Sequence, residues 1–380
     1  MRKVYLIDDS IISPLGFSTQ ENFQNLQENN IGIKEVDNND IWSAPFYGSV
    51  VDNTKLNEAW NSISNDKNGD YSKLEKMMIL SVSKLLSNNP SLDISRCGIV
   101  ISTTKGNIGE IRKEQNDKAY LGSIAKTIQG YFDLEQTPKV LSNACISGGL
   151  ALAIGKRMIQ AQLFDDVIVI GGDLLSEFTL SGFFSFQAVS AAPCKPFCKN
   201  RTGISLGEAA ASAWLSADKN KINGEVISIS GDASANDANH ISGPSRTGEG
   251  LYISITKALK EANLRSEQID YITAHGTATP FNDEMEAIAF NRAGLQEVPL
   301  NSLKGYYGHT LGASALIESI IARHCLLNNE LIASVGFEEL GVSQPVNVIT
   351  KNESKKLTRV LKTASGFGGC NVALIIEKLA

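Results

Sequence analysis

The stretch LSNACISGGLALAIGKRMIQ, residues 141–160, sets one cysteine at the start of a segment that is apolar on nearly every face. A helix that is apolar all round is buried in a core, and Ser147 with the two glycines behind it allows a tight turn before that helix. Unpaired N–H groups at a helix N-terminus favour a thiolate at Cys145 and can bind an oxyanion. On this stretch alone, a buried structural cysteine is an equally good interpretation.

Strand-like and helix-like segments alternate along the rest of the chain. The strand-like runs are VYLI (4–7), CGIVIS (97–102), VIVIGGD (167–173), EVISISGD (225–232) and IDYITAHG (269–276). The helical patterns lie near residues 71–87, 147–164, 246–263, 281–293 and 311–327. Buried, β-branched strands that alternate with helices predict an α/β fold built in layers.

The two halves of the chain repeat the same order of parts. CGIVISTT, the Cys145 helix and GISLGEAAASAWL in the first half correspond to IDYITAHGTAT, NSLKGYYGHTLGASALIESIIA and SGFGGCNVALIIEKL in the second. We therefore predict a duplicated α/β unit with a join near residues 215–225, that is, an N-terminal half over 1–218 and a C-terminal half over 219–380.

Composition excludes several classes of protein. A net charge of −6 over 380 residues argues against a general nucleic-acid binder, which needs a basic face. The longest apolar runs fall short of the roughly 20 residues that a membrane span requires. The N-terminal MRKVYLIDDS has no signal-peptide pattern, and the six cysteines follow no disulfide framework. We expect a cytoplasmic location.

Two of the four histidines lie in glycine-flanked loops that follow strands. His275 is in ITAHGTATPFNDEMEA and His309 is in NSLKGYYGHTLGASALIESI. Ligands of α/β folds gather at the carboxyl ends of strands. Each histidine alone could merely cap its loop, but two of them together with Cys145 favour a catalytic site.

The chain resembles the β-ketoacyl-acyl-carrier-protein synthases, the condensing enzymes of the thiolase superfamily with a Cys-His-His triad. The resemblance covers nearly the whole chain, through SPLGF, NACISGG, CKPFCKNRTGISLGEAA, DANHISGPSRTGEGL, AHGTATPFNDEMEA, KGYYGHTLGASALIE and SGFGGCNVALI. It implies a thiolase-like fold with duplicated α/β halves in a layered αβαβα architecture.

The resemblance also implies roles for individual residues. They are the nucleophile Cys145, the catalytic pair His275 and His309, the supporting pair Lys304 and Glu318, Thr277 and Thr279 facing the malonyl carboxylate, and the gate Phe367, whose N–H completes an oxyanion hole with that of Cys145. The implied reaction is decarboxylative condensation of a Cys145-bound acyl group with malonyl-acyl carrier protein, without a metal or cofactor.

The implied partners are acyl- and malonyl-loaded carrier protein and a second subunit, in a homodimer or in a heterodimer with a related ketosynthase-like chain. The pathway is that of fatty acids or of polyketides and polyenes, and the acyl group stays open. A partner subunit that keeps the triad without using it is an alternative. Ile146 and Cys198 depart from the family pattern, in the acyl pocket wall and in a loop respectively.

Three further motifs lead to separate predictions. Lys73 and Lys76 would share one helix face, and we expect them to form a docking patch for the acidic carrier protein. GISLG formally fits a nucleophile elbow, which leaves a serine hydrolase using Ser205 with Asp270 and His275 as a weaker alternative. Cys194 and Cys198 have no second pair at zinc spacing, so we expect no metal site there.

Overall fold

The computed structural model describes residues 2–63, 69–112, 116–222, 224–237 and 243–379. Within them, eleven strands form one sheet in the order β13-β11-β10-β15-β16-β9-β1-β8-β6-β4-β5. The strands from the first half of the chain are β1 (Tyr5–Ile12), β4 (Gly98–Ser102), β5 (Lys139–Leu141), β6 (Asp166–Asp173) and β8 (Ala209–Ser216). Those from the second half are β9 (Val226–Asn236), β10 (Tyr271–Thr273), β11 (Pro299–Asn301), β13 (Asn347–Val348), β15 (Arg359–Gly366) and β16 (Cys370–Leu379).

The strand order repeats between the halves. The edge strand β13 has no counterpart in the first half and is left out of this count. Read inward from β5, or inward from β11, the third of the five remaining strands of each half comes first, followed by the second, fourth, fifth and first. The first two pairings of each series are parallel and the next two antiparallel. The halves meet where β1 pairs with β9 at Tyr5 and Ser228. This repetition agrees with the predicted duplication, while the boundary between residues 218 and 219 stays a prediction.

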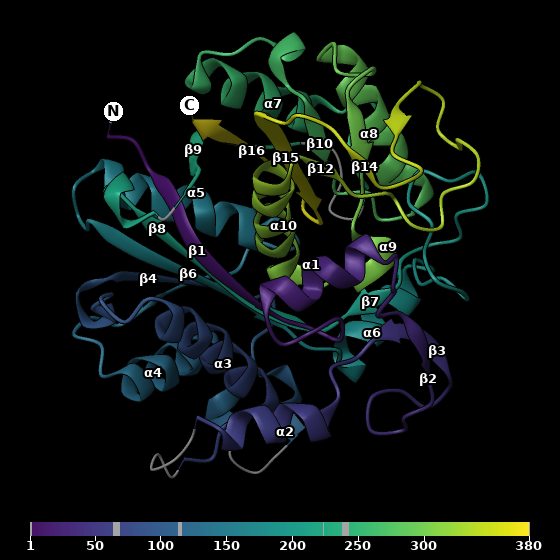
Figure 1. Cartoon of the computed structure of the whole chain (residues 1–380). Helices are drawn as coiled ribbons and strands as arrows, with labels where there is room; N and C mark the ends of the chain where they lie inside the picture. Colours follow the sequence, from purple (N-terminus) through teal and green to yellow (C-terminus); the bar gives the residue numbers. More distant parts are fainter. Residues whose placement is uncertain (1, 64–68, 113–115, 223, 238–242, 380) are drawn as a thin grey trace.

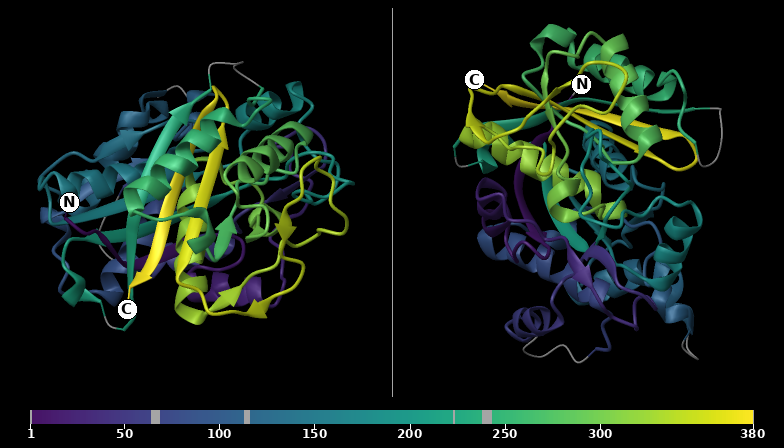
Figure 2. Two further views of the ribbon diagram at one scale, coloured as in Figure 1. Left: turned by 90° about the horizontal axis from the view of Figure 1, so that it is seen from above. Right: turned by 90° about the vertical axis from the view of Figure 1, so that its right-hand side faces the viewer.

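The helices complete five layers, which confirms the predicted architecture (Figure 1). α5 (Ser147–Gln160) and α10 (Ser314–Asn328) lie between the two parts of the sheet, α7 (Glu249–Ala262) and α8 (Pro280–Arg292) cover the second-half strands, and α3 (Lys73–Asn88) and α4 (Leu121–Phe132) cover the first-half strands. Figure 2 shows the long β16 and β15 beside β9 from above.

The remaining elements lie in the connections. They are the helices α1 (Thr19–Gln27), α2 (Asn53–Asn61), α6 (Glu177–Ser185) and α9 (Lys304–Tyr307), and the short strands β2 (Lys34–Val36), β3 (Phe46–Ser49), β7 (Leu206–Gly207), β12 (Glu330–Leu331) and β14 (Glu353–Ser354). In the described part of the chain, no helix is long and apolar enough to cross a membrane. Residues 238–242 of the DANHISGPSRTGEGL motif lie outside the described residues.

The central helices approach each other closely because the second residue of α5 is a glycine, Gly148. A Cβ on Gly148 would lie 2.7 Å from the backbone nitrogen of Leu316 and 2.9 Å from the carbonyl oxygen of Gly312. Only a residue without a side chain allows this backbone contact. The contact sets the turn that carries Cys145 directly against the loop before α10, which carries His309.

Candidate active site

A strained turn holds Cys145 at the start of α5. Ala144 adopts a φ of +44°, a conformation that side-chain-bearing residues rarely take. The Asn143 N–H donates to Ser147 Oγ at 2.8 Å, and the Ser147 hydroxyl donates to the Ala144 carbonyl at 2.7 Å. Ser147, the first residue of α5, thereby fixes the turn against the start of the helix. Cys145 is 7% exposed at this position.

His275 lies in the loop that follows β10, and carboxylates of α8 hold the amides of that loop. The N–H groups of His275 and Gly276 donate to Glu286 at 2.8 and 2.6 Å. The Thr277 N–H donates to Asp283 at 2.9 Å. These bonds fix the backbone on which the imidazole stands.

His309 follows Gly308, and its hydrogen bonds define its tautomer. The Leu311 N–H lies 3.3 Å from His309 Nδ1, and Ser314 Oγ lies 2.9 Å from the same atom. A backbone N–H can only donate, so Nδ1 accepts, and a neutral His309 carries its proton on Nε2. Within the described residues, Nε2 has no hydrogen-bond partner. It is therefore a free donor.

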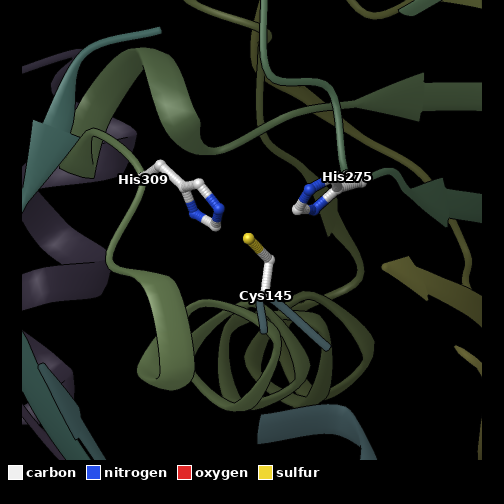
Figure 3. Close-up of side chains that lie close together, drawn as sticks. All are labelled: Cys145, His275 and His309. Carbon is white, nitrogen blue, oxygen red and sulfur yellow. The ribbon is translucent and has the colours of Figure 1, made fainter. Parts of the chain in front are cut away.

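The structure brings the three predicted catalytic residues together, as Figure 3 shows. Cys145 Sγ and one ring nitrogen of each of His275 and His309 all lie within 4.8 Å of one another. The two imidazole centroids are 5.2 Å apart and their planes are nearly perpendicular, at 84°. The sulfur points between the two rings from the N-terminus of α5.

Lys304 and Glu318 form the predicted pair beneath these rings. Lys304 Nζ lies 2.7 Å from Glu318 Oε1 and donates to the His275 carbonyl at 2.6 Å. The lysine connects the carboxylate on α10 to the His275 loop, so its side chain supports the histidine from the backbone side.

Comparison with known proteins agrees with this geometry. A family profile described as Beta-ketoacyl synthase, C-terminal domain, matches residues 226–338. The chain is 25% identical to a putative mitochondrial 3-oxoacyl-[acyl-carrier-protein] synthase of Schizosaccharomyces pombe, over 100% of this chain and 99% of the relative. It is 26% identical to 3-oxoacyl-[acyl-carrier-protein] synthase 2 of Synechocystis, over 99% of this chain and 98% of the relative. The chain is therefore similar over its whole length to β-ketoacyl-acyl-carrier-protein synthases, and residues 226–338 match the C-terminal domain of that family.

Solved structures share the fold of this chain over its whole length. The ishigamide ketosynthase/chain length factor superposes with a TM-score of 0.89 at 21% identity, covering 100% of both chains. One chain of the complex of the ketosynthase ApeO with its chain length factor ApeC from Xenorhabdus doucetiae superposes with a TM-score of 0.85 at 24% identity, covering 100% of this chain and 98% of that one.

Burial controls the protonation of Cys145, His275 and His309. It lowers the pKa of His275 and His309 well below the usual value, and the Lys304 charge lowers both further. Both rings are therefore neutral at physiological pH. Burial also raises the pKa of the Cys145 thiol to about 11, although the ammonium groups of Lys105 and Lys304 oppose this shift. The prediction that the helix N-terminus favours a thiolate is wrong for the substrate-free protein, because desolvation outweighs it.

Two other predicted features surround the three residues. The Thr277 and Thr279 hydroxyls bond each other at 2.8 Å at the start of α8. Phe367 lies in the turn between β15 and β16, is 40% exposed, and its backbone hydrogen-bonds the Cys145 thiol. Its ring lies against Phe183 and Phe186, with centroids 5.6 and 5.3 Å away. An aromatic cluster thus borders the approach to the sulfur.

The two lysines predicted to bind carrier protein have different surroundings. Lys73 Nζ lies 2.6 Å from the buried carboxylate of Glu208 and donates to the Val51 carbonyl at 2.9 Å. Its charge is already paired, so it cannot serve as a free docking cation. Lys76 is half-buried, with its ammonium 5.9 Å from the Trp60 ring centroid. The docking prediction is left with Lys76 alone.

The serine-hydrolase alternative is wrong, because its residues are not assembled. Ser205 Oγ is buried and accepts from the Cys194 N–H at 3.1 Å. Asp270 precedes β10, whereas His275 follows it, and the Asp270 carboxylate accepts from the amides of Thr358 and Arg359. No Ser-His-Asp relay can form from groups with these partners.

The loop that carries Cys198 is anchored although Cys198 departs from the family pattern. The Cys198 thiol is buried, and the Arg201 guanidinium donates to the carbonyls of Cys198 and Gly341 at 2.9 and 2.6 Å. The Phe197 N–H donates to Asp283 at 2.7 Å. Backbone contacts and one arginine thus hold the loop.

The triad could in principle ligate a metal, since it offers one sulfur and two imidazole nitrogens within 4.8 Å. Zn²⁺ accepts these ligand types. The surrounding charge is unfavourable for a dication, because the buried ammonium groups of Lys304 and Lys362 lie directly behind the histidine loop. The arrangement fits thiol chemistry with neutral donors better than it fits a metal centre.

Sequence reasoning missed several residues that shape this site. Asp283 and Glu286 hold the His275 loop, and their spacing of three on a predicted helix in NDEMEA was a usable signal, because it places both on one face. Ser314 orients His309, and Lys362 lies behind the His275 loop. For these two, the sequence carries no local signal.

Proposed function

We propose that the chain catalyses decarboxylative condensation of an acyl group held on Cys145 with malonyl-acyl carrier protein. The observation that carries the proposal is the convergence of one thiol and two neutral imidazoles in a water-poor site. The catalytic roles of these residues are part of the proposal.

Acylation comes first and needs no permanent base. Cys145 Sγ attacks the thioester carbonyl of the acyl carrier, a sulfur–carbon bond forms, and the carrier thiol leaves with the proton that Cys145 gives up. Because one thiol replaces another, a resting thiol with a pKa of about 11 is compatible with the step. The backbone N–H groups of Cys145 and Phe367 stabilise the tetrahedral oxyanion.

Decarboxylation generates the carbon nucleophile. The malonyl carboxylate leaves as carbon dioxide, and its bonding electron pair becomes an enolate on the thioester oxygen. Nε2–H of His309 and the His275 ring donate to that oxygen, while Thr277 and Thr279 face the departing carboxylate. The enolate carbon then attacks the acyl-Cys145 carbonyl, the carbon–sulfur bond breaks, and the departing Cys145 thiolate takes a proton from water to restore the thiol. Lys304 and Glu318 support His275 from behind.

The relatives suggest a pathway of fatty-acid or polyketide synthesis. The chain resembles 3-oxoacyl-[acyl-carrier-protein] synthases and, at 28% identity over 67% of its length, the ketoacyl synthase alpha subunit of tetracenomycin polyketide synthase from Streptomyces glaucescens. Carrier protein is the proposed partner, and a homodimer or a heterodimer with a ketosynthase-like subunit is the proposed assembly. A reducing compartment such as the cytoplasm belongs to the proposal, because the nucleophile must remain a thiol.

The test separates the two half-reactions. Purified protein is incubated with a panel of acyl-carrier proteins and weighed intact, and release of carbon dioxide from malonyl-carrier protein is measured in parallel. We expect one acyl group on wild type and none on Cys145→Ala. We expect His275→Ala and His309→Ala to accept the acyl group but to lose decarboxylation by about 10²–10³-fold. Absence of acylation with every carrier would favour the alternative of a non-catalytic partner subunit.

A further inference from the structure

A second buried lysine, Lys362 on β15, shares the carboxylate of Glu318 with Lys304. Lys304 Nζ lies 2.7 Å from Oε1, and Lys362 Nζ lies 2.7 Å from Oε2. The three side chains are 0%, 1% and 3% exposed, in the order Lys304, Lys362 and Glu318. Two ammonium groups against one carboxylate leave one positive charge in excess. Burying an excess charge is costly, so packing alone does not account for Lys362.

The two lysines act on one short piece of backbone. Lys362 Nζ lies 3.3 Å from the carbonyl oxygen of Thr273 and 3.4 Å from that of Ala274, while Lys304 donates to the carbonyl of His275. Three consecutive carbonyls at the end of β10 therefore face ammonium groups. On the other side, Glu286 binds the N–H groups of His275 and Gly276. The segment is held between cations and an anion.

We propose that Lys362 is a positioning residue for decarboxylation, which fixes the His275 loop together with Lys304 and supplies the excess positive charge behind the two imidazoles. The inference rests on the proposed condensation and deepens it. The excess charge favours neutral rings over imidazolium, and it favours the negative charge that develops on the enolate oxygen.

Other charged groups also face the imidazoles, and the test must separate them from Lys362. Lys105, after β4, acts on the His309 ring, Asp283 and Glu286 on α8 bind backbone N–H groups of the His275 loop, and Asp173 on β6 acts on the neighbouring Cys145 thiol. Burial is the first cause that lowers the pKa of His275 and His309, and the charges of Lys304 and then Lys362 act in the same direction. Burial also raises the pKa of Glu286 to about 7. Because the Glu286 carboxylate also interacts with the Lys362 ammonium, the comparison of lysine and its variants at position 362 is repeated in a Glu286→Gln background, which removes the Glu286 titration.

The experiment uses Lys362→Met and Lys362→Gln in the full chain. Methionine removes charge and hydrogen bonds, whereas glutamine removes the charge and keeps two N–H donors for the carbonyls. Each variant is acylated, the acylated sites are counted by intact mass, and malonyl-carrier decarboxylation per active site is followed from about pH 5 to 8. Lys156→Met is the matched control: Lys156 is also 1% exposed and pairs with Asp232 at 2.9 Å, on the part of α5 remote from Cys145.

We expect Lys362→Met to keep acylation within about threefold and to lose decarboxylation by about 10- to 100-fold, as loss of a partner that orients a functional histidine commonly does. We expect the acid limb of the rate profile to move to higher pH by about one unit in both Lys362 variants, because a unit charge inside a protein shifts a neighbouring pKa by that order. Lys156→Met should lower the free energy of unfolding without moving the acid limb of the rate profile.

Four results would overturn the proposal: an unmoved acid limb, equal losses in both half-reactions, the same shift in Lys156→Met, or Lys362 variants that never yield acylatable protein while Lys156→Met does. The last result would assign Lys362 to folding. If wild type itself neither acylates nor decarboxylates, the proposed function fails instead, so the two failures are distinguishable.

Discussion

Replacing Gly148 by alanine should separate the fold from the geometry of the site. The added Cβ would lie 2.7 Å from the Leu316 nitrogen, whereas ordinary contact begins at 3.4 Å, so α5 and α10 must move apart by about 0.7 Å. The two nearest atoms, the Leu316 nitrogen and the Gly312 carbonyl oxygen, belong to the backbone, so they cannot move independently as the end of a flexible side chain can. Cys145 lies three residues before Gly148, and His309 lies three before Gly312, so the displacement reaches both catalytic groups.

The expected losses follow from that displacement. Misplacement of reacting groups by 1 Å can cost about 10²-fold in rate, so a shift of this size predicts a loss of roughly 10- to 100-fold in condensation. Overpacking a core costs about 1–3 kcal/mol, and the better helix propensity of alanine returns about 0.5–1 kcal/mol. Gly148→Ala should therefore stay folded, with only a modest fall in the free energy of unfolding.

The neighbouring Gly149 provides the matched control. Its Cβ would meet Val372 Cγ1 at 3.0 Å and Ala315 Cβ at 3.4 Å, which are side-chain methyl groups that can shift by a few tenths of an ångström. Both variants are compared by urea unfolding and by condensation rate per acylatable Cys145. Gly149→Ala should keep most of its activity. If folded Gly148→Ala condenses at the wild-type rate, the close helix contact does not position the site and the reasoning is refuted.

Four other substitutions test single charges. Burial raises the pKa of the Glu286 carboxyl from 4.5 to about 7, so the native state binds the proton more tightly and the free energy of unfolding of wild type falls as pH rises from about 4.5 to 7. Glu286→Gln should remove this fall. Wild-type urea midpoints that do not change across this pH range would contradict the prediction. Lys105→Met should slow iodoacetamide alkylation of Cys145 at pH 8.5 by about 3- to 10-fold, because the thiol loses a charge that lowers its pKa, and an unaltered rate by intact mass would remove Lys105 from the site. Lys76→Glu should raise KM for acyl-carrier protein by about 3- to 10-fold and leave KM for a pantetheine thioester unchanged. Lys73→Glu should instead destabilise the fold, because the new carboxylate would face Glu208. Equal effects of Lys76→Glu on both substrates would show that carrier protein docks elsewhere.

Local pattern was sufficient for the elements that carry the triad. The apolar segment behind Cys145 is the buried helix α5 and the His275 loop follows strand β10, as predicted, whereas the short helix α9 lies between strand β11 and the His309 loop. The predicted helices near 281–293 and 311–327 correspond to α8 and α10 within three residues at each end. These features depend on residues close together in sequence, where periodicity and turn residues determine the backbone.

Properties that depend on the surroundings of a residue in the folded protein, such as its pKa or its ion-pair partner, could not be predicted from the sequence. The Cys145 pKa depends on how completely the fold removes water from the sulfur, and no motif reports that. Lys73 looked like a surface cation because its helix spacing matched Lys76, yet its partner Glu208 lies far along the chain. Long-range pairing decides whether a lysine is free, and spacing along one helix cannot show it.

Lys362 shows why such a residue escapes prediction. A single lysine within the strand-like run RVLKTASG is normally expected to face solvent, because polar residues of a half-exposed strand alternate outward. β15 has no solvent face at this point, since it lies between β10 and β16 in the sheet and α10 packs against it. Lys362 is therefore forced inward, where Glu318 is the carboxylate that meets it. Burying the Lys362 charge there lowers the stability of the fold. The proposed positioning of the neighbouring His275 loop is a function that would account for keeping the charge.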